Sequence, residues 1–271
     1  MKTRFTLFMA LFFLFSISTS VFSYGSLEPD EDDNNFWVMP LHENLYGSLP
    51  TGAISAYVGF QSRFNIPSII QEYHITEIWE GAFSNKEISY VDLPFYLTYI
   101  GDRAFAWNNI SEINFPRDLT YIGAGAFARN RINYIVFPRG LTEIGDFAFR
   151  GNQLESLFIP DSVTFIGMAA FENNQITSLY ISRNLKSISD FAFLDNHITS
   201  IWIPISVLHI GTGAFLGNPI TEIIIGENVS IENNEVIPTF PHGFVEFYNA
   251  TGQRAGTYNY IDGEWEIRLW N

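Results

Sequence analysis

Apolar and polar positions along the chain repeat with a fixed period from Ile75 to about Asn228. An Ala-Phe pair marks every 22-residue unit, at Ala82-Phe83, Ala104-Phe105, Ala126-Phe127, Ala148-Phe149, Ala170-Phe171, Ala192-Phe193 and Ala214-Phe215. An isoleucine lies five residues before each of these phenylalanines, and an isoleucine or leucine lies five residues after it. A fixed period of this length predicts a β-rich solenoid, in which each unit buries its apolar side only against its neighbours.

Each unit carries the signals of two short strands and a bend. Ile113 and Phe115 alternate with the polar Glu112 and Asn114, which is the period of two that a half-exposed strand shows. A proline follows this strand in most units and ends it, because proline cannot donate to a strand ladder. The segment Leu119–Ile122 predicts a second strand, and a glycine after it allows the chain to turn. The rest of the unit has room for one short helical turn.

Two columns of the repeat have a predicted structural role. The phenylalanine of each Ala-Phe pair is expected to point into the lumen and to stack on the phenylalanine of the next coil. A polar column contains Asn108, Asn130, Asn152, Asn174, Asn196 and Asn218, and Lys86 replaces asparagine in the first unit. We expect these amides to form a ladder of hydrogen bonds with the backbone rather than a binding site.

The N-terminus has the pattern of a secretory signal peptide over residues 1–23. Lys2 and Arg4 form a short basic region, and the apolar run Phe5–Ile17 follows it. Val21 and Ser23 are small enough for cleavage after Ser23. The run is shorter than the roughly 20 residues of a membrane-spanning helix, so the mature protein is expected to be secreted or held at the cell surface without an integral span.

The predicted organisation continues from this signal to the C-terminus. Residues 24–51 read as an acidic leader and irregular segment, residues 52–74 as an N-terminal cap or degenerate repeat with strand-like pieces at Ile54–Phe60 and Ile66–Ile70, and residues 75–231 as seven repeats. Residues 232–271 predict a small β-meander that caps the last coil or forms an attached module, with strands at Phe244–Tyr248, Thr257–Ile261 and Trp265–Trp270 and a turn at Asp262-Gly263.

Composition and charge narrow the classes of function. The net charge of −15 argues against nucleic acid and against an anionic membrane surface as partners. The chain has no cysteine, so disulfides and thiolate metal sites are excluded. The five histidines show no metal-ligand spacing, and paired carboxylates fall on turns of different coils. We therefore predict no catalytic residues, no metal and no cofactor.

The complete repeat resembles a known family. The pattern Leu-x-x-Ile-Gly-x-x-Ala-Phe-x-x-Asn-x-Ile-x-x-Ile-x-Phe-Pro stands as Leu119–Pro138 and recurs at Leu141–Pro160. It is similar to the leucine-rich repeats of the BspA-like, or spirochaete surface antigen, type, over roughly residues 54–231. Asparagine stands where many members carry cysteine. The tail between Phe247 and Trp265 looks like C-terminal segments attached to such repeats in spirochaetes.

The resemblance implies a right-handed, curved leucine-rich-repeat coil with a parallel β-sheet, on exported proteins that bind host or neighbouring-cell components. It implies no catalysis and does not name a ligand.

One outward column of the first strand is unusually apolar. It reads Asp92, Asn114, Val136, Phe158, Tyr180, Trp202 and Ile224, and the neighbouring outward column contains Tyr90 and Tyr134. Adjacent coils lie about 4.8 Å apart, so the apolar part would form a stripe roughly 15–20 Å long. We predict a binding surface made of Tyr90, Tyr134, Val136, Phe158, Tyr180 and Trp202.

Two structural interpretations of this column remain open. Aromatic residues have high β-propensity and cover one another across strands, or the terminal segments fold over them. The leading functional hypothesis is an exported, non-enzymatic scaffold for recognition or adhesion that binds host or neighbouring-cell proteins. The alternatives are a carbohydrate-binding surface protein and a purely structural envelope protein.

Overall fold

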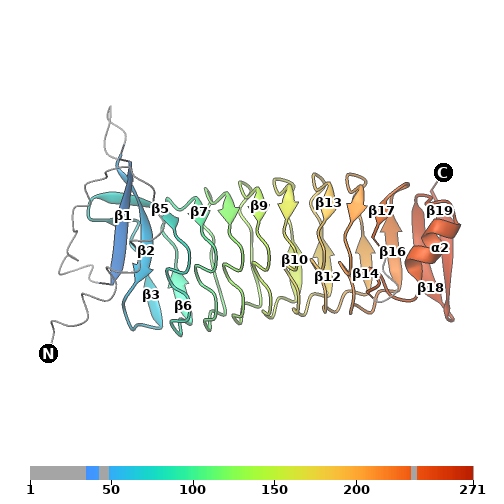
Figure 1. Ribbon diagram of the computed structural model, residues 1–271, viewed down its shortest axis with the longest axis horizontal. Coiled ribbons are helices and arrows are strands. Elements are labelled where there is room, and N and C mark those ends of the chain that lie inside the picture. Colours follow the sequence, from blue (N-terminus) through green and yellow to red (C-terminus); the bar gives the residue numbers. More distant parts are fainter. Residues whose placement is uncertain (1–34, 43–48, 233–236, 271) are drawn as a thin grey trace, which may run out of the picture.

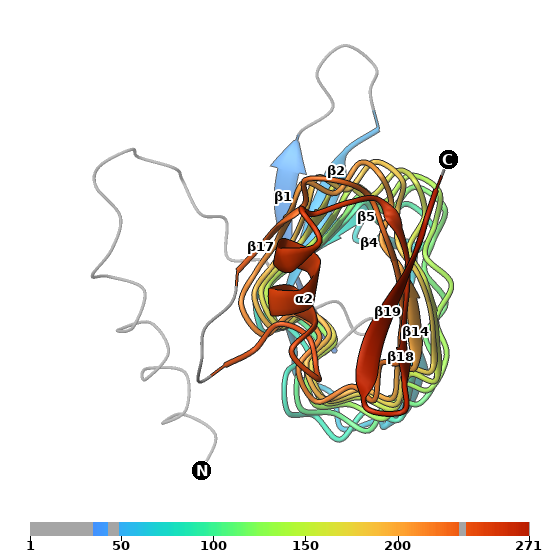
Figure 2. The same ribbon diagram turned by 90° about the vertical axis from the view of Figure 1, so that its right-hand side faces the viewer.

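The chain forms an elongated solenoid in the computed structural model, which describes residues 35–42, 49–232 and 237–270 (Figure 1). The predicted signal peptide and the acidic stretch that follows it lie outside the described residues. Within the described ranges, no helix combines the length and the apolar character that crossing a membrane requires. Viewed along its long axis, the solenoid shows coils that superimpose on one another (Figure 2).

Parallel strands line two sides of the coils. The glycine side, named for the glycine that follows most of its strands, carries β5 (Tyr73–Ile78), β7 (Tyr99–Ile100), β8 (Tyr121–Ile122), β9 (Glu143–Ile144), β11 (Phe165–Ile166), β13 (Ser187–Ile188), β15 (His209–Ile210) and β17 (Ser230–Ile231). The proline side carries β3 (Arg63–Asn65), β6 (Tyr90–Asp92), β10 (Ser156–Phe158), β12 (Ser178–Tyr180), β14 (Ser200–Trp202) and β16 (Glu222–Ile225). Partners such as Tyr121 and Glu143, or Ser156 and Ser178, occupy the same position in successive units. The predicted parallel solenoid with a 22-residue period is confirmed.

The phenylalanine column fills the lumen. All seven of its side chains, from Phe83 to Phe215, are fully buried. Successive rings are stacked with centroids 4.8 Å apart at the first pair and 5.7 Å apart at the Phe171–Phe193 pair. Tyr57 continues this stack at its N-terminal end and Phe240 at its C-terminal end. The prediction of an inward, stacked column is confirmed. Tyr57 and Phe240 are the residues through which the two caps extend the core at its ends.

The asparagine column forms the expected ladder. The Asn130 amide nitrogen donates to the carbonyl oxygens of Phe105, at 2.9 Å, and of Phe127, at 3.2 Å. Its Oδ1 accepts the N–H of Ile110 at 3.0 Å. Each asparagine therefore bonds backbone of the preceding coil as well as its own. Lys86 stands at this position in the first coil, and the N–H that an asparagine there would accept, that of Ile66, already donates to Asp92 O at 3.0 Å.

The N-terminal cap is built from a hairpin and short strands. β1 (Phe36–His42) pairs antiparallel with β2 (Thr51–Tyr57), and β2 pairs in parallel with β5. The strand expected at Ile54–Phe60 begins earlier and ends at Tyr57, and Phe60 is fully exposed. The piece expected at Ile66–Ile70 reduces to β4 (Ile69–Ile70), which pairs antiparallel with β5, because Pro67 lies between β3 and β4 and cannot donate to a ladder.

At the C-terminal end the prediction is partly wrong. Phe244–Tyr248, expected as a strand, lies in the helix α2 (Phe244–Ala250). Its buried residues Phe244, Val245 and Tyr248 have the spacing of a helical face. The hairpin that follows agrees with the prediction. β18 (Gly256–Ile261) and β19 (Glu264–Leu269) are joined at Asp262-Gly263, where both residues have positive φ.

Candidate functional site

The predicted apolar stripe lies on the outward face of the proline side. Leu157 in β10 points into the core, whereas its neighbours Ser156 and Phe158 are exposed. Tyr134, Val136 and Phe158 keep about three-fifths of their surface in solvent, at 59%, 62% and 61%. The inward and outward alternation of side chains along the short strands thus exposes large apolar residues to solvent on this side, where polar residues are usual.

The aromatic residues of the stripe contact one another across coils. Phe158 and Tyr180 are stacked, with ring centroids 4.6 Å apart and planes 11° apart. Tyr180 and Trp202 are tilted by 35° at 6.2 Å. These contacts leave Tyr180 and Trp202 half-buried, so part of the aromatic surface covers itself, as the structural interpretation expects. The ring edges and the free face of Phe158 remain accessible.

A shallow groove runs across the stripe where a small residue interrupts it. Val136 is shorter than the ring of Phe158 that follows it on the next coil. The groove has a volume of about 520 Å³ and is lined by Tyr134, Ile135, Val136, Phe137, Ser156, Leu157, Phe158, Ser178, Leu179 and Tyr180. It therefore combines apolar walls with the hydroxyls of Ser156 and Ser178, which is the composition of a surface that admits an apolar side chain.

Tyr90 does not belong to this surface. Its hydroxyl donates to Asp92 Oδ1 at 2.6 Å, and the guanidinium of Arg63 lies 4.8 Å from its ring centre. The hydrogen bond to Asp92 raises the pKa of Tyr90. Glu112 pairs with Tyr134 on the adjacent coil and separates Tyr90 from the groove. Of the six predicted binding residues, the structure brings together five.

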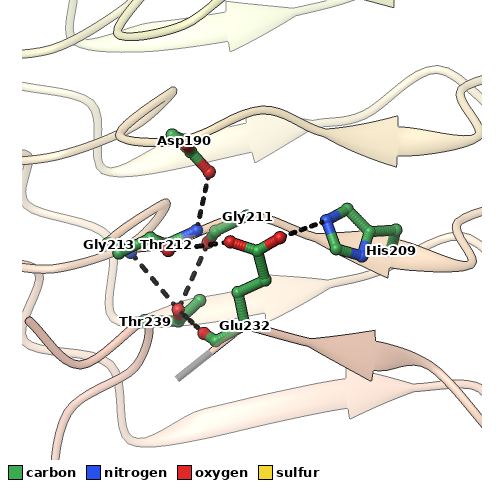
Figure 3. A network of polar contacts seen from close by, with 7 residues as sticks. All are labelled: Asp190, His209, Gly211, Thr212, Gly213, Glu232 and Thr239. Atoms are coloured by element: carbon green, nitrogen blue, oxygen red, sulfur yellow. Dashed lines mark hydrogen bonds and ion pairs between the residues drawn. The ribbon is translucent and has the colours of Figure 1, made fainter. Parts of the chain in front are cut away.

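A polar network on the glycine side brings together a histidine, two hydroxyls and two carboxylates, which are residue types that catalytic sites use (Figure 3). His209 Nε2 lies 3.2 Å from Glu232 Oε1, and the Thr212 hydroxyl donates to Glu232 Oε2 at 2.8 Å. Asp190 Oδ1 accepts the backbone N–H of Thr212 at 2.8 Å. Both threonine and histidine bond the same carboxylate, so the histidine is not placed to take a proton from the hydroxyl.

The same network ties the last coil to the C-terminal segment. The buried Thr239 hydroxyl donates to Gly211 O at 3.2 Å, contacts Glu232 O, and accepts the N–H of Gly213 at 3.3 Å. These bonds join residues 211–213 of the last full coil to the segment leading into α2, which is a structural role. Neither in this network nor in any other part of the described chain are three His, Cys, Asp or Glu side chains grouped so that they could hold a metal ion.

Comparison with protein families matches residues 53–175 and 120–236 to the model of the BspA type leucine rich repeat region. The two ranges together cover more than half of the chain. This chain belongs to the BspA type leucine-rich repeat family. The sequence-based resemblance is thereby confirmed for the repeat region.

Solved structures of other leucine-rich repeat proteins are similar to this BspA type chain. A leucine rich cell surface protein from Faecalibacterium prausnitzii A2-165 matches with a TM-score of 0.61 and 22% identity, covering 90% of this chain and 62% of that protein. The T. pallidum leucine rich repeat protein TpLRR matches with a TM-score of 0.48 and 25% identity, covering 62% and 81%. A leucine-rich repeat protein from Bacteroides ovatus ATCC 8483 gives 0.47 and 21%, covering 76% and 67%.

This chain therefore spans less than two thirds of the length of the F. prausnitzii protein. Among curated proteins, none has a sequence that matches it significantly.

The outward strand columns of this BspA type protein did not predict one residue of the stripe region, Arg183. The guanidinium of Arg183 lies 5.9 Å from the ring centres of both Tyr180 and Trp202. Arg183 follows Tyr180 by three residues, in the turn after β12. Reading the turn column beside the strand column would have found it, because arginine in that position reaches back over the aromatic face. It adds a positive charge to an apolar surface of an acidic protein.

Proposed function

We propose that this BspA type repeat protein is an exported, non-enzymatic scaffold that binds a protein partner. The binding surface is the proline-side stripe, made of Tyr134, Val136, Phe158, Tyr180 and Trp202. The observation that carries the proposal is the groove beside Phe158, whose apolar walls stay open to solvent. Exposed apolar patches of this kind mark interaction sites, and tyrosine and tryptophan are frequent anchors of protein interfaces.

The rigidity of the scaffold supports binding by a preformed surface. Each stripe residue sits on a coil whose phenylalanine is stacked on both neighbours and whose asparagine bonds the preceding coil. A partner does not have to order this surface when it binds, so little of the interaction free energy is lost to conformational entropy. Adhesion to host or neighbouring-cell proteins is the proposed purpose.

Export rests on the predicted signal peptide over residues 1–23. The similarity to a leucine rich cell surface protein of F. prausnitzii is consistent with export. The proposed location is therefore outside the cell, either secreted or at the cell surface.

Carbohydrate is the second candidate ligand, because Ser156 and Ser178 line the same groove as the rings of Phe158 and Tyr180. Sugar rings bind aromatic residues by lying on the ring face. Phe158 covers one face of Tyr180, and Trp202 with Arg183 adjoins the same ring. The free face of Phe158 is then the main platform left, which favours a protein ligand that inserts a side chain into the groove.

The test is binding of the protein to a panel of purified extracellular and cell-surface proteins, with a glycan array in parallel. Tyr180→Ala/Trp202→Ala should lower affinity for a protein ligand at least about tenfold with little change in melting temperature. Tyr99→Ala/Tyr121→Ala is the control, because these rings also form an aromatic pair across adjacent coils, with centroids 4.8 Å apart, but on the glycine side. Equal losses for both double variants would exclude the stripe as the site, and glycan binding that requires Phe158 would establish the carbohydrate alternative.

A further inference from the structure

The last strand of the solenoid has an open edge. The proline-side sheet runs in the order β14-β16-β18-β19, so β19 has a single neighbour, β18, within the described chain. Figure 2 shows this hairpin at the C-terminal end of the coils. An edge strand presents a row of unpaired N–H and C=O groups, which natural proteins use for pairing or protect. β19 contains no proline, and its pairing with β18 shows no bulge.

The register identifies the backbone groups on the open edge. Tyr260 donates its N–H to Thr221 O of the last coil at 2.8 Å, so its backbone faces away from β19. Tyr260 is opposite Trp265. In an antiparallel ladder, the N–H and C=O groups of two opposite residues either both point toward the partner strand or both point away from it. The backbone of Trp265 therefore points outward. Because this orientation alternates along a strand, Ile267 and Leu269 also present their N–H and C=O groups to the open edge.

The side chains of β19 carry opposite charges on one face. Glu266 and Arg268 are both exposed and are two residues apart, so they lie on the same face of the strand. The ion pairs among the described residues involve neither of them. On the opposite face Leu269 keeps 42% of its surface exposed, whereas Trp265 is buried. The strand thus has both unpaired charges and uncovered apolar surface at its open edge.

We propose that two copies of this chain pair through β19, antiparallel, about a two-fold axis at Ile267. In this register Ile267 faces its own copy, and Glu266 of each copy faces Arg268 of the other. On the apolar face, Trp265 of each copy lies opposite Leu269 of the other, which covers the exposed surface of that leucine. The pairing therefore satisfies the open backbone groups, the free charges and the apolar surface together.

The two-fold registers centred on the nearest residues of β19 are less favourable because each of them opposes like charges. An axis at Glu266 places two glutamates opposite each other, and an axis at Arg268 does the same with two arginines. An axis at Trp265 brings Glu264 opposite Glu266. Like charges directly opposite each other destabilise a strand pair, and opposite charges stabilise it. The edge is therefore complementary to itself in the Ile267 register, which identifies a second copy as the occupant rather than an unrelated strand.

The resulting dimer would have one continuous sheet running from β14 of one copy to β14 of the other. Closed two-fold pairing uses up both edges and stops at two copies. A pair of strands as short as β19 buries less than the area of a standard stable interface, so dimerisation is expected to depend on protein concentration. This inference is independent of the proposed ligand, because β19 lies beyond the last coil and the stripe lies on coils three to six.

The test is sedimentation equilibrium over a range of protein concentrations. Glu266→Arg or Arg268→Glu alone replaces both cross-strand ion pairs by like-charge pairs and should weaken dimerisation at least about tenfold. The double swap Glu266→Arg/Arg268→Glu restores opposite charges in the same register and should recover dimerisation. Ile267→Pro removes an N–H that faces the open edge, so it should abolish the dimer while the circular dichroism spectrum stays that of the folded monomer.

Two results would overturn the proposal. One is a wild-type protein that is monomeric at concentrations on the order of 1 mM. The other is a dimer that the single charge swaps leave unchanged, or that the double swap fails to restore, because the Ile267 register requires both responses.

Discussion

The rings of Phe149 and Phe171 lie 2° from parallel, with their centroids 5.5 Å apart, although a whole repeat separates them in the sequence. This relationship recurs along the lumen, so each ring contacts a ring on the coil before it and another on the coil after it. Removing one ring interrupts a continuous stack rather than a local contact.

Phe149→Ala is therefore expected to lower the free energy of unfolding by about 3–5 kcal/mol, because it leaves a ring-sized cavity between two fully buried neighbours. Chemical denaturation monitored by circular dichroism measures the change. Phe158→Ala is the control, since it removes the same side chain from an exposed position on the proline side. Similar losses for the two variants would contradict the assignment of one ring to the lumen and the other to the surface.

Asn152→Leu should lower the free energy of unfolding by about 2–4 kcal/mol, although leucine is similar in size and suits a buried site. The substitution leaves the buried Ile132 N–H without its partner at 3.0 Å and removes one of the two amides that donate to the Phe127 carbonyl, the one at 2.9 Å. Denaturant titration of this variant beside Gln153→Leu, which alters the exposed neighbouring residue, checks the effect. A loss no larger than that of the control would show that the ladder contributes little.

Thr239→Val tests the polar network that joins the last coil to the C-terminal segment. Valine fills the same space but leaves the Gly213 N–H and the Gly211 carbonyl without the buried hydroxyl that now bonds both. The expected loss is about 1–3 kcal/mol in the free energy of unfolding. Thr212→Val removes a less buried hydroxyl from the same network and should have a smaller effect. The reverse order would assign the main contribution to the Glu232 side chain.

Buried tyrosines predict a loss of stability at high pH. Burial raises the pKa of Tyr248, whose hydroxyl donates to Gly226 O at 2.7 Å. A tyrosine in the unfolded chain releases its proton near pH 10, whereas Tyr248 in the folded chain keeps it to a higher pH. Its contribution to stability is therefore complete below about pH 10 and is lost as the pH rises toward the raised value.

Denaturation at about pH 9 and about pH 11 measures this loss. Tyr248→Phe should be less stable than the wild type at neutral pH, because it lacks the bond to Gly226, but its stability should fall less between the two pH values. An equal fall in both proteins would show that other groups, such as the buried Tyr57 and Tyr258, account for the alkaline sensitivity.

The core of the solenoid could be predicted from the sequence because its tertiary contacts repeat the period of the chain. Phe149 contacts Phe127 and Phe171 because each lies one repeat away in the sequence. Residues at the same position of successive repeats are therefore the residues that contact one another. The ends have no such period. Phe244–Tyr248 is rich in residues of high β-propensity. Yet the rings of Phe244 and Tyr248 lie 5.8 Å apart and both contact Tyr258, which residues four apart achieve on a helix and not along a strand.

The surface was predicted less completely than the core. Alternation along the strand placed Phe158 and Val136 outward, as the structure has them. It could not show the groove, which results from the difference in side-chain volume between residues on adjacent coils. The alternation also could not separate Tyr90 from the other five residues. Tyr90 contacts Arg63, which belongs to the N-terminal cap, and Asp92 in its own strand, and the repeat does not predict the first of these contacts.

The constant one-repeat offset between facing strands has a consequence for how the protein can vary. Deleting residues 131–152 would place Phe127 against Phe171 and would keep an asparagine ahead of Gln153-Leu154, so every rung would find an equivalent partner. A deletion that is not a whole number of repeats would leave the two halves out of phase. Recombination between repeats can therefore change the length of the solenoid in steps of about 4.8 Å. Both caps would still pack against coils of the same shape.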